Sequence, residues 1–393
     1  MSMAAAGAFE KAERLRQLPP YLFVEIDRAK RTLMAEGKDV IDLGVGDPDL
    51  PTPAHIIAKL KATVDEPVNH RYSFTEGLTA LREAIARWYE RRFGVSLDPG
   101  TEVLPLLGSK EGLAHFPLAV ANAGDAVLVP DPCYPPYRSG TVFAGADVVS
   151  LPLLEEQGFF PDLGGVSQKA ARRAKALFLN YPNNPTAAMA SAEQFQEAIQ
   201  FAKEFGLAVA HDAAYSEIAF DGTKPLSFLQ MPDAKSVGVE FHSFSKTYNM
   251  TGWRVGWVCG NAAMVAALGE LKSNLDSGIF QPVQYAAIEA LEGDQAPLAQ
   301  AVAAYQARRD LLVDGLAKAG WQVPKPSATF YVWARVPGQE SSVSFAARIL
   351  KQARVVITPG VGFGPSGEGY VRFSLTLPTE RIEEAVVRLA TAL

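Results

Sequence analysis

The sequence predicts an α/β protein with a large domain, built on a mostly parallel sheet flanked by helices, and a smaller α+β domain. Three observations support this prediction. The chain has 393 residues, about twice the length of a typical domain. Its middle alternates short apolar runs with helix-like segments, and after about residue 282 longer helical segments alternate with isolated strands.

The alternating middle part predicts the sheet of the large domain. Five short runs are rich in β-forming residues and bounded by Pro, Gly or Asp, at 125–130, 176–182, 207–212, 237–243 and 255–260. Between the second and third, the segment 191–206 predicts a helix that Ser191 caps and Gly206 ends. Strands that alternate with helices form a mostly parallel sheet, covered on both faces. Ligands of such sheets bind at the carboxyl ends of the strands.

The C-terminal part predicts the second domain. A helical run at 301–320 precedes a strand in 327–336, a helix near 343–353, a strand in 369–377 and a final amphipathic helix at 378–392. We expect the N-terminal segment to join this domain. The predicted division is therefore a large domain at 47–281 and a small domain formed by 1–46 together with 282–393.

Composition excludes several classes of function. The net charge of −6 argues against nucleic acid or an anionic membrane as a main partner, because both attract basic surfaces. Cys133 and Cys259 are the only cysteines and form no CxxC motif, so neither a disulfide framework nor a zinc cluster is expected. The five histidines show no ligand spacing, so no metal is expected. The start lacks the apolar core of a signal peptide, and no apolar run approaches the ~18 residues of a membrane span. We therefore expect a cytoplasmic protein.

One lysine has an unusual setting. Lys246 lies in "HSFSKTYNMTGWRVGW", at the end of a predicted strand and among small residues. Most lysines are solvated surface charges, but one that loses its proton can form a Schiff base with an aldehyde. Pyridoxal phosphate (PLP) is the common aldehyde cofactor. It needs donors for its phosphate, an anion for its pyridine nitrogen and an aromatic face for its ring.

The sequence offers groups for the phosphate. Ser243, Ser245 and Arg254 lie close to the lysine, and an arginine can bind two phosphate oxygens at once. Separately, "LLGSKEG" at 106–112 is a Gly-Ser turn that leads into a helix. The backbone N–H groups of that helix start, with the Ser109 hydroxyl, form an anion site.

The sequence also offers groups for the ring. Asp212 ends an apolar strand, where a carboxylate is costly unless it is paired. Three residues on, Tyr215 could reach the ring hydroxyl, and Tyr134 in the loop "DPCYPPY" could stack on the ring. Taken one at a time, a strand-terminal aspartate is usually a cap or turn residue, and a loop tyrosine usually has no special role.

Three segments resemble the class I/II aminotransferases, which are PLP enzymes of fold type I. They are "NYPNNPTAA", "HDAAYSEIAFDG" and "HSFSKTYNMTGWRVG", and the resemblance extends over nearly the whole chain. It implies Lys246 as the Schiff-base lysine and Asp212 on the pyridine nitrogen. It further implies that Tyr215 and Asn184 lie at the ring hydroxyl, that Tyr134 stacks on the ring, and that Ser109, Lys110, Ser243, Ser245 and Arg254 surround the phosphate.

The resemblance also implies a shared site and a substrate anchor. Tyr72 matches a tyrosine that reaches the phosphate of the neighbouring subunit, and Ser277 is a second candidate for this role, so a homodimer is expected. Arg372 in "GYVRFSL" matches the arginine that holds the substrate α-carboxylate through two bonds. Gly46 matches a glycine whose backbone lies against the same carboxylate, although it can also be read as a turn glycine.

The chain departs from the family pattern at Ala187, where Gly usually follows "NNPT". If φ is positive there, the alanine costs about 1 kcal/mol. The departure concerns the turn and leaves the chemistry intact, since Asn184 and Pro185 are both present.

The implied reaction is a transamination. Lys246 releases the cofactor when a substrate amine displaces it, then takes the Cα proton and returns it to the cofactor, while a 2-keto acid such as 2-oxoglutarate accepts the amino group in a second half-reaction. Segments 70–99, 108–119 and 240–256 are similar to the LL-diaminopimelate aminotransferase branch. That branch implies a role in lysine biosynthesis, with Tyr21 and Lys110 at the substrate.

Other readings stay open. Broad-specificity aminotransferases of aspartate, alanine or aromatic amino acids share this framework, and a PLP carbon–sulfur β-lyase uses the same catalytic positions. The segment "GFGPSG" at 362–367 fits the GxGxxG pattern of dinucleotide enzymes but precedes a predicted strand instead of opening a helix. A transcriptional regulator with a PLP-like domain needs an added DNA-binding module, for which the fold leaves no residues.

Overall fold

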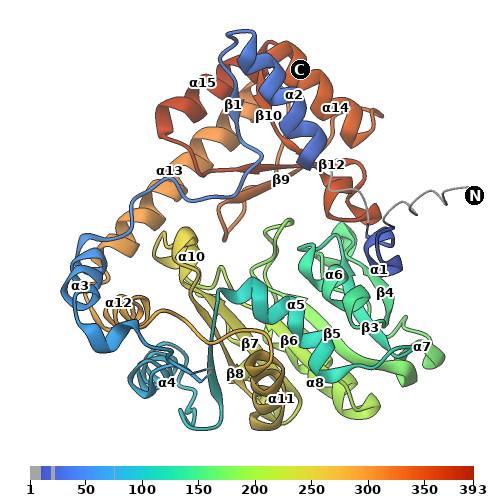
Figure 1. Cartoon of the computed structure of the whole chain (residues 1–393). Helices are drawn as coiled ribbons and strands as arrows, with labels where there is room; N and C mark the ends of the chain where they lie inside the picture. The colour runs from blue at the N-terminus through green and yellow to red at the C-terminus, as the bar shows by residue number, and fades with distance from the viewer. Residues whose placement is uncertain (1–9, 19–22, 75) are drawn as a thin grey trace, which may run out of the picture.

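The computed structural model describes residues 10–18, 23–74 and 76–393, which form two bodies (Figure 1). The lower body, which is the large domain, contains a seven-stranded sheet with the order β2-β8-β7-β6-β5-β3-β4. Its strands are β2 (Val103–Leu106), β3 (Ala126–Asp131), β4 (Asp147–Pro152), β5 (Ala174–Asn180), β6 (Ala208–Asp212), β7 (Gly238–Ser243) and β8 (Gly256–Gly260). The mostly parallel sheet predicted from the sequence is confirmed; β8 alone runs antiparallel, to both β2 and β7.

The sheet is covered on both faces because its strands alternate their side chains between two cores. In β5, Leu177 and Leu179 enter one core, while Ala176 and Phe178 enter the other. The first core is closed by α4 (Thr79–Phe93), α8 (Ala192–Phe205) and α12 (Gln281–Glu292), with α3 (Ala54–Val64) packed on α12. The second is closed by α5 (Ser109–Val120), α6 (Pro136–Phe143) and α11 (Ala262–Ser273). Three shorter helices are α7 (Gln168–Arg173), α9 (Ala234–Val237) and α10 (Phe244–Thr247).

The predicted helix at 191–206 is confirmed as α8, together with its ends. Ser191 and Gln194 form a reciprocal capping box, and Gly206 ends the helix in a left-handed conformation with φ of 70°. All five predicted strands are also present. Strands β2 and β4, at the two edges of the sheet, were not predicted from the sequence. In β4 only Leu151 is buried, so this strand carries little of the apolar pattern on which the prediction depended.

The upper body, which is the small domain, has a core of its own, formed by its small sheet and by helices packed against it (Figure 1). The antiparallel sheet has the order β11-β12-β9, and a separate parallel pair joins β1 to β10. The strands are β1 (Ile41–Asp42), β9 (Tyr331–Arg335), β10 (Val355–Val356), β11 (Thr358–Pro359) and β12 (Tyr370–Ser374), and the helices are α2 (Phe23–Ala35), α13 (Ala296–Lys318), α14 (Ser342–Ala353) and α15 (Thr379–Ala390). A four-residue helix, α1 (Glu13–Arg16), precedes them.

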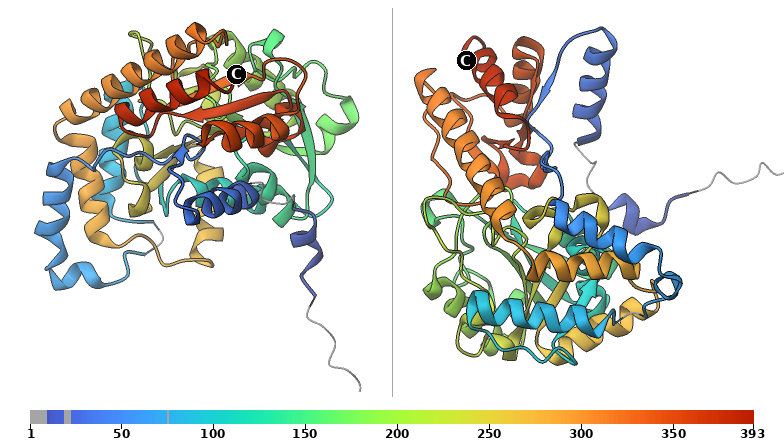
Figure 2. Two further views of the ribbon diagram at one scale, coloured as in Figure 1. Left: turned by 90° about the horizontal axis from the view of Figure 1, so that it is seen from above. Right: turned by 90° about the vertical axis from the view of Figure 1, so that its left-hand side faces the viewer.

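The N-terminal segment reaches the upper body through β1, which pairs with β10 near the other end of the chain. In the side view of Figure 2, α13 rises from the lower body along the upper one. The predicted division at 47–281 stays a prediction. Because the apolar side chains of α12 belong to the core of the large sheet, we favour a second boundary beyond Glu292.

The segment 362–367 has no nucleotide-binding geometry. It forms two short 3₁₀ turns, Gly360–Phe363 and Pro365–Gly367, and leads into β12. A dinucleotide fingerprint requires a strand, a glycine turn and then an α-helix whose N-terminus faces the pyrophosphate. The pattern therefore carries no evidence for a dinucleotide enzyme.

Candidate active site

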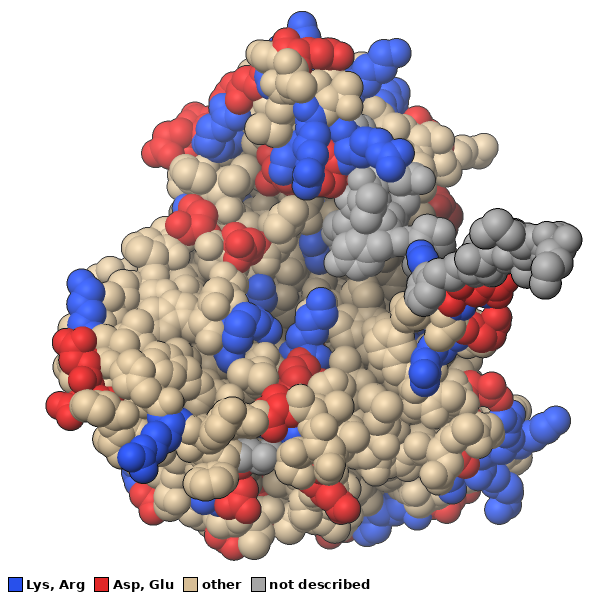
Figure 3. Space-filling view, viewed as in Figure 1, with Lys and Arg blue, Asp and Glu red and all other residues tan. Residues whose placement is uncertain are grey.

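A cavity of about 1260 Å³ lies between the two bodies, where the carboxyl ends of β6 and β7 face the small domain. Figure 3 shows the hollow with lysine and arginine side chains on its floor. Most of the residues predicted from the sequence line it: Gly46, Ser109, Lys110, Tyr134, Asn184, Asp212, Tyr215, Ser243, Ser245, Lys246, Arg254 and Arg372. Residues far apart in sequence thus meet in one cleft.

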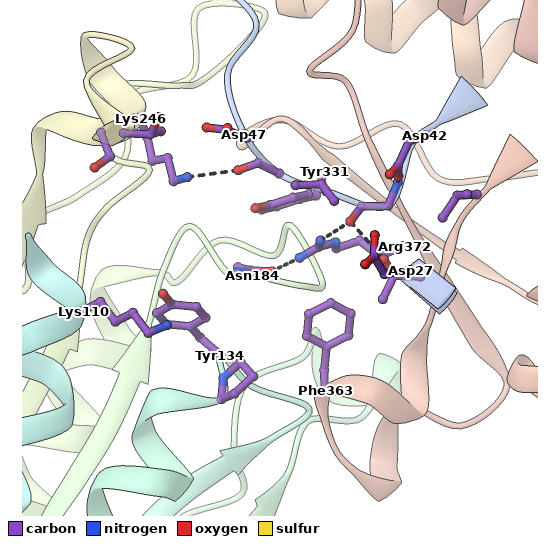
Figure 4. Close-up of a pocket in the computed structure, with 18 of the residues that line it drawn as sticks. Asp27, Asp42, Asp47, Lys110, Tyr134, Asn184, Lys246, Tyr331, Phe363 and Arg372 are labelled. Carbon is purple, nitrogen blue, oxygen red and sulfur yellow. Dashed lines mark hydrogen bonds between the residues drawn. The ribbon is translucent and has the colours of Figure 1, made fainter. Parts of the chain in front are cut away.

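Lys246 projects from α10, the short helix that follows β7, toward the small domain (Figure 4). Its Nζ donates to the carbonyl oxygen of Gly46 at 3.0 Å and lies 5.7 Å from the centre of the Phe330 ring. Burial lowers the pKa of this amine below its ordinary value. Tyr331 and Asp47 offset part of this change, and the positive charges of Arg372 and Arg254 add to it. The lysine can therefore become a neutral, nucleophilic amine more readily than a surface lysine can.

Asp212 ends β6 with its carboxylate almost fully buried. One oxygen accepts from the Tyr137 hydroxyl at 2.6 Å, and the other accepts from the backbone N–H of Ala214 at 3.2 Å. Burial raises the pKa of Asp212, while these two bonds lower it in part. A buried carboxylate with two neutral donors is costly unless a cation pairs with it, so the site fits a protonated ring nitrogen.

An anion cradle lies where α5 begins. The first N–H groups of a helix have no partner within the helix, and α5 presents them after Gly108. The Arg254 guanidinium is fixed close by through bonds to the carbonyl oxygens of Thr251 (2.9 Å) and Leu107 (3.3 Å). At Gly108, where φ is +81°, an added Cβ would lie 2.2 Å from Arg254 Nη2. Only glycine lets the backbone approach the arginine this closely. The N–H groups at the start of α5 and the Arg254 guanidinium together fit a phosphate.

Arg372 on β12 forms the other end of the site. Its guanidinium donates to the side-chain oxygen of Asn184 at 2.8 Å and to the carbonyl oxygen of Gly44 at 2.7 Å (Figure 4). The rings of Tyr331 and Phe363 lie 4.1 and 4.6 Å from its central carbon. These contacts hold a fixed cation in a buried place, which is the requirement for binding a carboxylate through two bonds.

Sequence reasoning missed Tyr331. Its hydroxyl lies 3.0 Å from the hydroxyl of Tyr215 and close to Gly46, where an added Cβ would be 2.0 Å from it. Only glycine therefore allows Tyr331 to approach the backbone this closely, and the expected contact of Gly46 with a substrate carboxylate stays a prediction. In "FYVWA", Tyr331 reads as an ordinary apolar strand residue. Tyr137, three residues after Tyr134, was not predicted either.

Two of the predicted residues that the structure describes lie outside this cavity. Tyr72 and Ser277 line a separate hollow on the large domain, and the Tyr72 side chain is 77% exposed. Tyr21 lies outside the described residues. Within the described part of the chain, no group of three His, Cys, Asp or Glu side chains is arranged to hold a metal ion, and no helix is both long and apolar enough to cross a membrane.

An aldehyde cofactor that carries a phosphate fits this cleft, with an amine of lowered pKa, a buried carboxylate and an anion cradle around it. Comparison with known proteins agrees. The family model for aminotransferase class I and II matches residues 38–389, so the chain belongs to this family and is a PLP-dependent aminotransferase.

Individual proteins resemble the chain over almost its full length. An LL-diaminopimelate aminotransferase of Syntrophobacter fumaroxidans is 56% identical over 97% of this chain and 98% of its own. One of Desulforudis audaxviator is 56% identical and covers 97% of each chain. Among solved structures, substrate-bound BacF of Bacillus subtilis has a TM-score of 0.93 at 40% identity, covering 98% of both chains. An aspartate aminotransferase mutant of Thermus thermophilus has a TM-score of 0.91 at 30% identity, covering 98% of this chain and 100% of its own. These matches confirm fold type I.

Proposed function

We propose that this aminotransferase takes the amino group from LL-diaminopimelate and passes it to 2-oxoglutarate, in lysine biosynthesis. The two relatives with 56% identity carry that name, which supports the donor substrate. The site geometry supports it as well. LL-diaminopimelate carries an ammonium and a carboxylate at each end, so its far end needs partners of both signs.

The cavity provides such partners on its small-domain side. Besides the predicted residues, it is lined by charged side chains of α2 and β1, namely Asp27, Arg28, Lys30, Arg31 and Asp42. Lys30 pairs with Asp42 at 2.6 Å, and Arg31 pairs with Asp27 at 2.6 Å. A lining of this kind suits a long substrate with charged groups at both ends better than alanine or an aromatic amino acid, whose side chains carry no charge.

The fixed position of Arg372 relative to Lys246 is the observation that carries the proposal. A substrate carboxylate bound to Arg372 is held between Asn184 and Gly44, and Gly46 links this end of the cavity to the Lys246 amine. Orientation of this kind contributes much of the rate of a reaction between bound groups. We infer that this geometry places the substrate Cα next to the Lys246 amine.

The residues then divide the work. PLP, when bound, supplies an aldehyde for the amino group and a ring that accepts electron density from Cα. Burial lowers the pKa of Lys246, so its amine can take the proton from Cα and then return it to the cofactor. Asp212 would hold the proton on the ring nitrogen, and Tyr215 with Asn184 would face the ring hydroxyl. The phosphate would be held by Ser109, Lys110, Ser243, Ser245 and Arg254, and Tyr134 would cover the ring.

The test is a half-reaction followed by absorption. The purified protein is mixed with LL-diaminopimelate in the absence of a keto acid. We expect the band of the lysine-bound cofactor to give way to the band of its amine form and to return when 2-oxoglutarate is added. A response to aspartate, alanine or phenylalanine but not to LL-diaminopimelate would exclude the proposed donor and leave the transamination reaction in place. Release of ammonia and pyruvate from cysteine-type substrates would identify a carbon–sulfur lyase instead.

We also propose a homodimer with shared sites in the cytoplasm. The exposed positions of Tyr72 and Ser277 outside the main cavity support a role toward a second subunit. The two cysteines are both unpaired and buried, which supports a reducing compartment. The hollow that contains Tyr72 and Ser277 is flanked by the exposed ring of Phe74, an apolar surface typical of subunit contacts.

A further inference from the structure

Tyr137 lies directly behind the site without lining its cavity. It belongs to α6, is fully buried, and donates its hydroxyl to Asp212 Oδ2 at 2.6 Å. We propose that Tyr137 is a positioning residue for the cofactor: its hydroxyl keeps Asp212 ionised and oriented for the pyridine nitrogen of PLP. The inference rests on the proposed role of Asp212 as the partner of that nitrogen.

The bonds to Asp212 fix the plane of its carboxylate. Tyr137 occupies Oδ2, and the backbone N–H of Ala214 occupies Oδ1 at 3.2 Å. With one donor on each oxygen, the carboxylate cannot rotate without losing a bond that is costly to break in a buried place. The remaining lone pairs of both oxygens are left for a cation on the cavity side, which Asp212 lines.

The ring of Tyr137 is itself held in place. It stacks on Phe178 with a centroid distance of 4.8 Å and an interplanar angle of 12°, and meets Tyr134 edge-on at 5.9 Å. Tyr134 is the residue expected to stack on the cofactor ring. A single side chain therefore connects the residue expected at the ring face with the residue expected at the ring nitrogen, so a shift of Tyr137 would disturb both.

The Tyr137 hydroxyl helps to keep the buried Asp212 ionised. Burial raises the pKa of Asp212, and among the groups that lower it the Tyr137 hydroxyl has the largest effect. Two imidazoles also act on Asp212, His211 on the same strand and His242 on the next. Both bond to the buried carboxylate of Glu240, at 2.8 and 3.0 Å, and not to Asp212. Without the Tyr137 hydroxyl, Asp212 keeps only one direct donor among the described residues, and its pKa should rise.

The experiment compares two buried tyrosines that each donate to a buried carboxylate. Tyr137→Phe removes the donor to Asp212 and keeps the stacked ring. The matched control is Tyr89→Phe, since Tyr89 is also fully buried and donates to Glu240 at 2.9 Å outside the cavity. The dissociation constant of PLP is measured by absorption titration of each apoprotein between pH 5 and 9. This readout needs no amino acid substrate, so it is independent of the proposed donor.

We expect Tyr137→Phe to bind PLP about tenfold more weakly, the loss typical of a hydrogen bond to a charged group. The pH below which binding weakens should also move upward, because Asp212 then protonates more easily. Tyr89→Phe should shift neither quantity, although both variants lose thermal stability. Equal PLP affinity and pH dependence in Tyr137→Phe and the wild type would overturn the proposal, and so would equal shifts in the two variants.

A second substitution tests the proposal if Tyr137→Phe does not fold. Incorporating 3,5-difluorotyrosine at position 137 keeps the ring and makes its hydroxyl a stronger donor. The pH at which PLP binding weakens should then move downward, opposite to the change expected for Tyr137→Phe. A shift upward, or no shift, would show that the hydroxyl does not set the charge of Asp212.

Discussion

The central carbon of the Arg372 guanidinium lies 4.1 Å from the centre of the Tyr331 ring. The hydroxyl of the same tyrosine lies 3.0 Å from that of Tyr215. Tyr331 therefore touches both the proposed anchor of the substrate carboxylate and the proposed partner of the cofactor's ring hydroxyl. Because Tyr331 is on β9 and Arg372 on the adjacent β12, the small domain fixes the substrate end of the site relative to the cofactor end.

Arg372→Lys should raise the KM for the amino acid about 10- to 100-fold, the loss expected when a two-bond carboxylate contact becomes a single one. Lysine also loses the stacking of the planar guanidinium between Tyr331 and Phe363. The absorption band of the bound cofactor should not change. Steady-state kinetics checks the prediction, with Arg335→Lys on the exposed surface as control. A normal KM in Arg372→Lys would remove Arg372 from the carboxylate site.

Gly46→Ala should lower kcat/KM about 10- to 100-fold, the range typical of small displacements of catalytic groups. The added methyl would lie 2.0 Å from the Tyr331 hydroxyl oxygen and 2.7 Å from its ring, so the tyrosine must move. That movement disturbs Tyr215 and Arg372 together. Gly164→Ala is the control, because its added methyl meets its nearest atom at an ordinary 3.5 Å. Unchanged kinetics in Gly46→Ala would mean that Tyr331 has no role in positioning.

The rate at which PLP attaches to the apoprotein should rise with pH and reach half its maximum below pH 10.5, the ordinary pKa of a lysine amine. The sign follows from the chemistry. Only the neutral amine attacks the aldehyde, and burial lowers the pKa of Lys246, so the neutral form appears at lower pH than in a solvated lysine. Stopped-flow absorption measures the rate, and Lys246→Ala should show no covalent band at any pH. A half-maximum at or above the ordinary pKa contradicts the prediction.

Ala187→Gly should stabilise the protein by about 0.5–1 kcal/mol. An alanine at this position is costly only where φ is positive, and φ of Ala187 is 60°. Glycine adopts that conformation without the clash of a Cβ, although the loss of a buried methyl offsets part of the gain. Urea unfolding of the PLP-saturated protein measures the change. Ala188→Gly next to it, where φ is not positive, should not stabilise, and a loss of stability in Ala187→Gly would refute the argument.

The sequence predicted the central strands and most of the cavity lining because both leave strong local patterns. Lys246, Asp212 and Arg254 are polar residues in apolar or glycine-rich surroundings, and such placements are costly unless a ligand repays them. The edge strands β2 and β4 were not predicted because β2 has only four residues and β4 buries only one of its six. Strand direction, as in β8, depends on which strands become neighbours, and no local pattern encodes that.

Tyr331 and Tyr137 could not be identified for a related reason. A buried tyrosine in a strand or short helix has the same local pattern whether its hydroxyl meets a catalytic group or a backbone carbonyl. Tyr181, for example, is also buried and donates to the carbonyl oxygen of Phe159. The partner is set by tertiary packing over long sequence separations, here 75 residues between Tyr137 and Asp212.

Mixing two impaired variants should restore activity if the sites are shared between subunits. The Lys246→Ala variant lacks the reactive amine but keeps Tyr72. The Tyr72→Ala variant keeps the amine but lacks the tyrosine. In a mixed dimer, one site would combine the intact Lys246 of one chain with the intact Tyr72 of the other, and the second site would lack both. The side chain of Tyr72 is 77% exposed in the single chain and lies outside the main cavity, so it is accessible to a partner.

We expect Tyr72→Ala alone to bind PLP about tenfold more weakly, as for a lost hydrogen bond to a charged phosphate. Activity at limiting PLP should rise when the two variants are unfolded and refolded together. Mixing without subunit exchange is the control and should give only the sum of the separate activities. An active monomer in sedimentation, with normal PLP affinity in Tyr72→Ala, would exclude a shared site. Recovery in the co-refolded sample would assign Tyr72 to the neighbouring site, because neither variant alone contains a complete one.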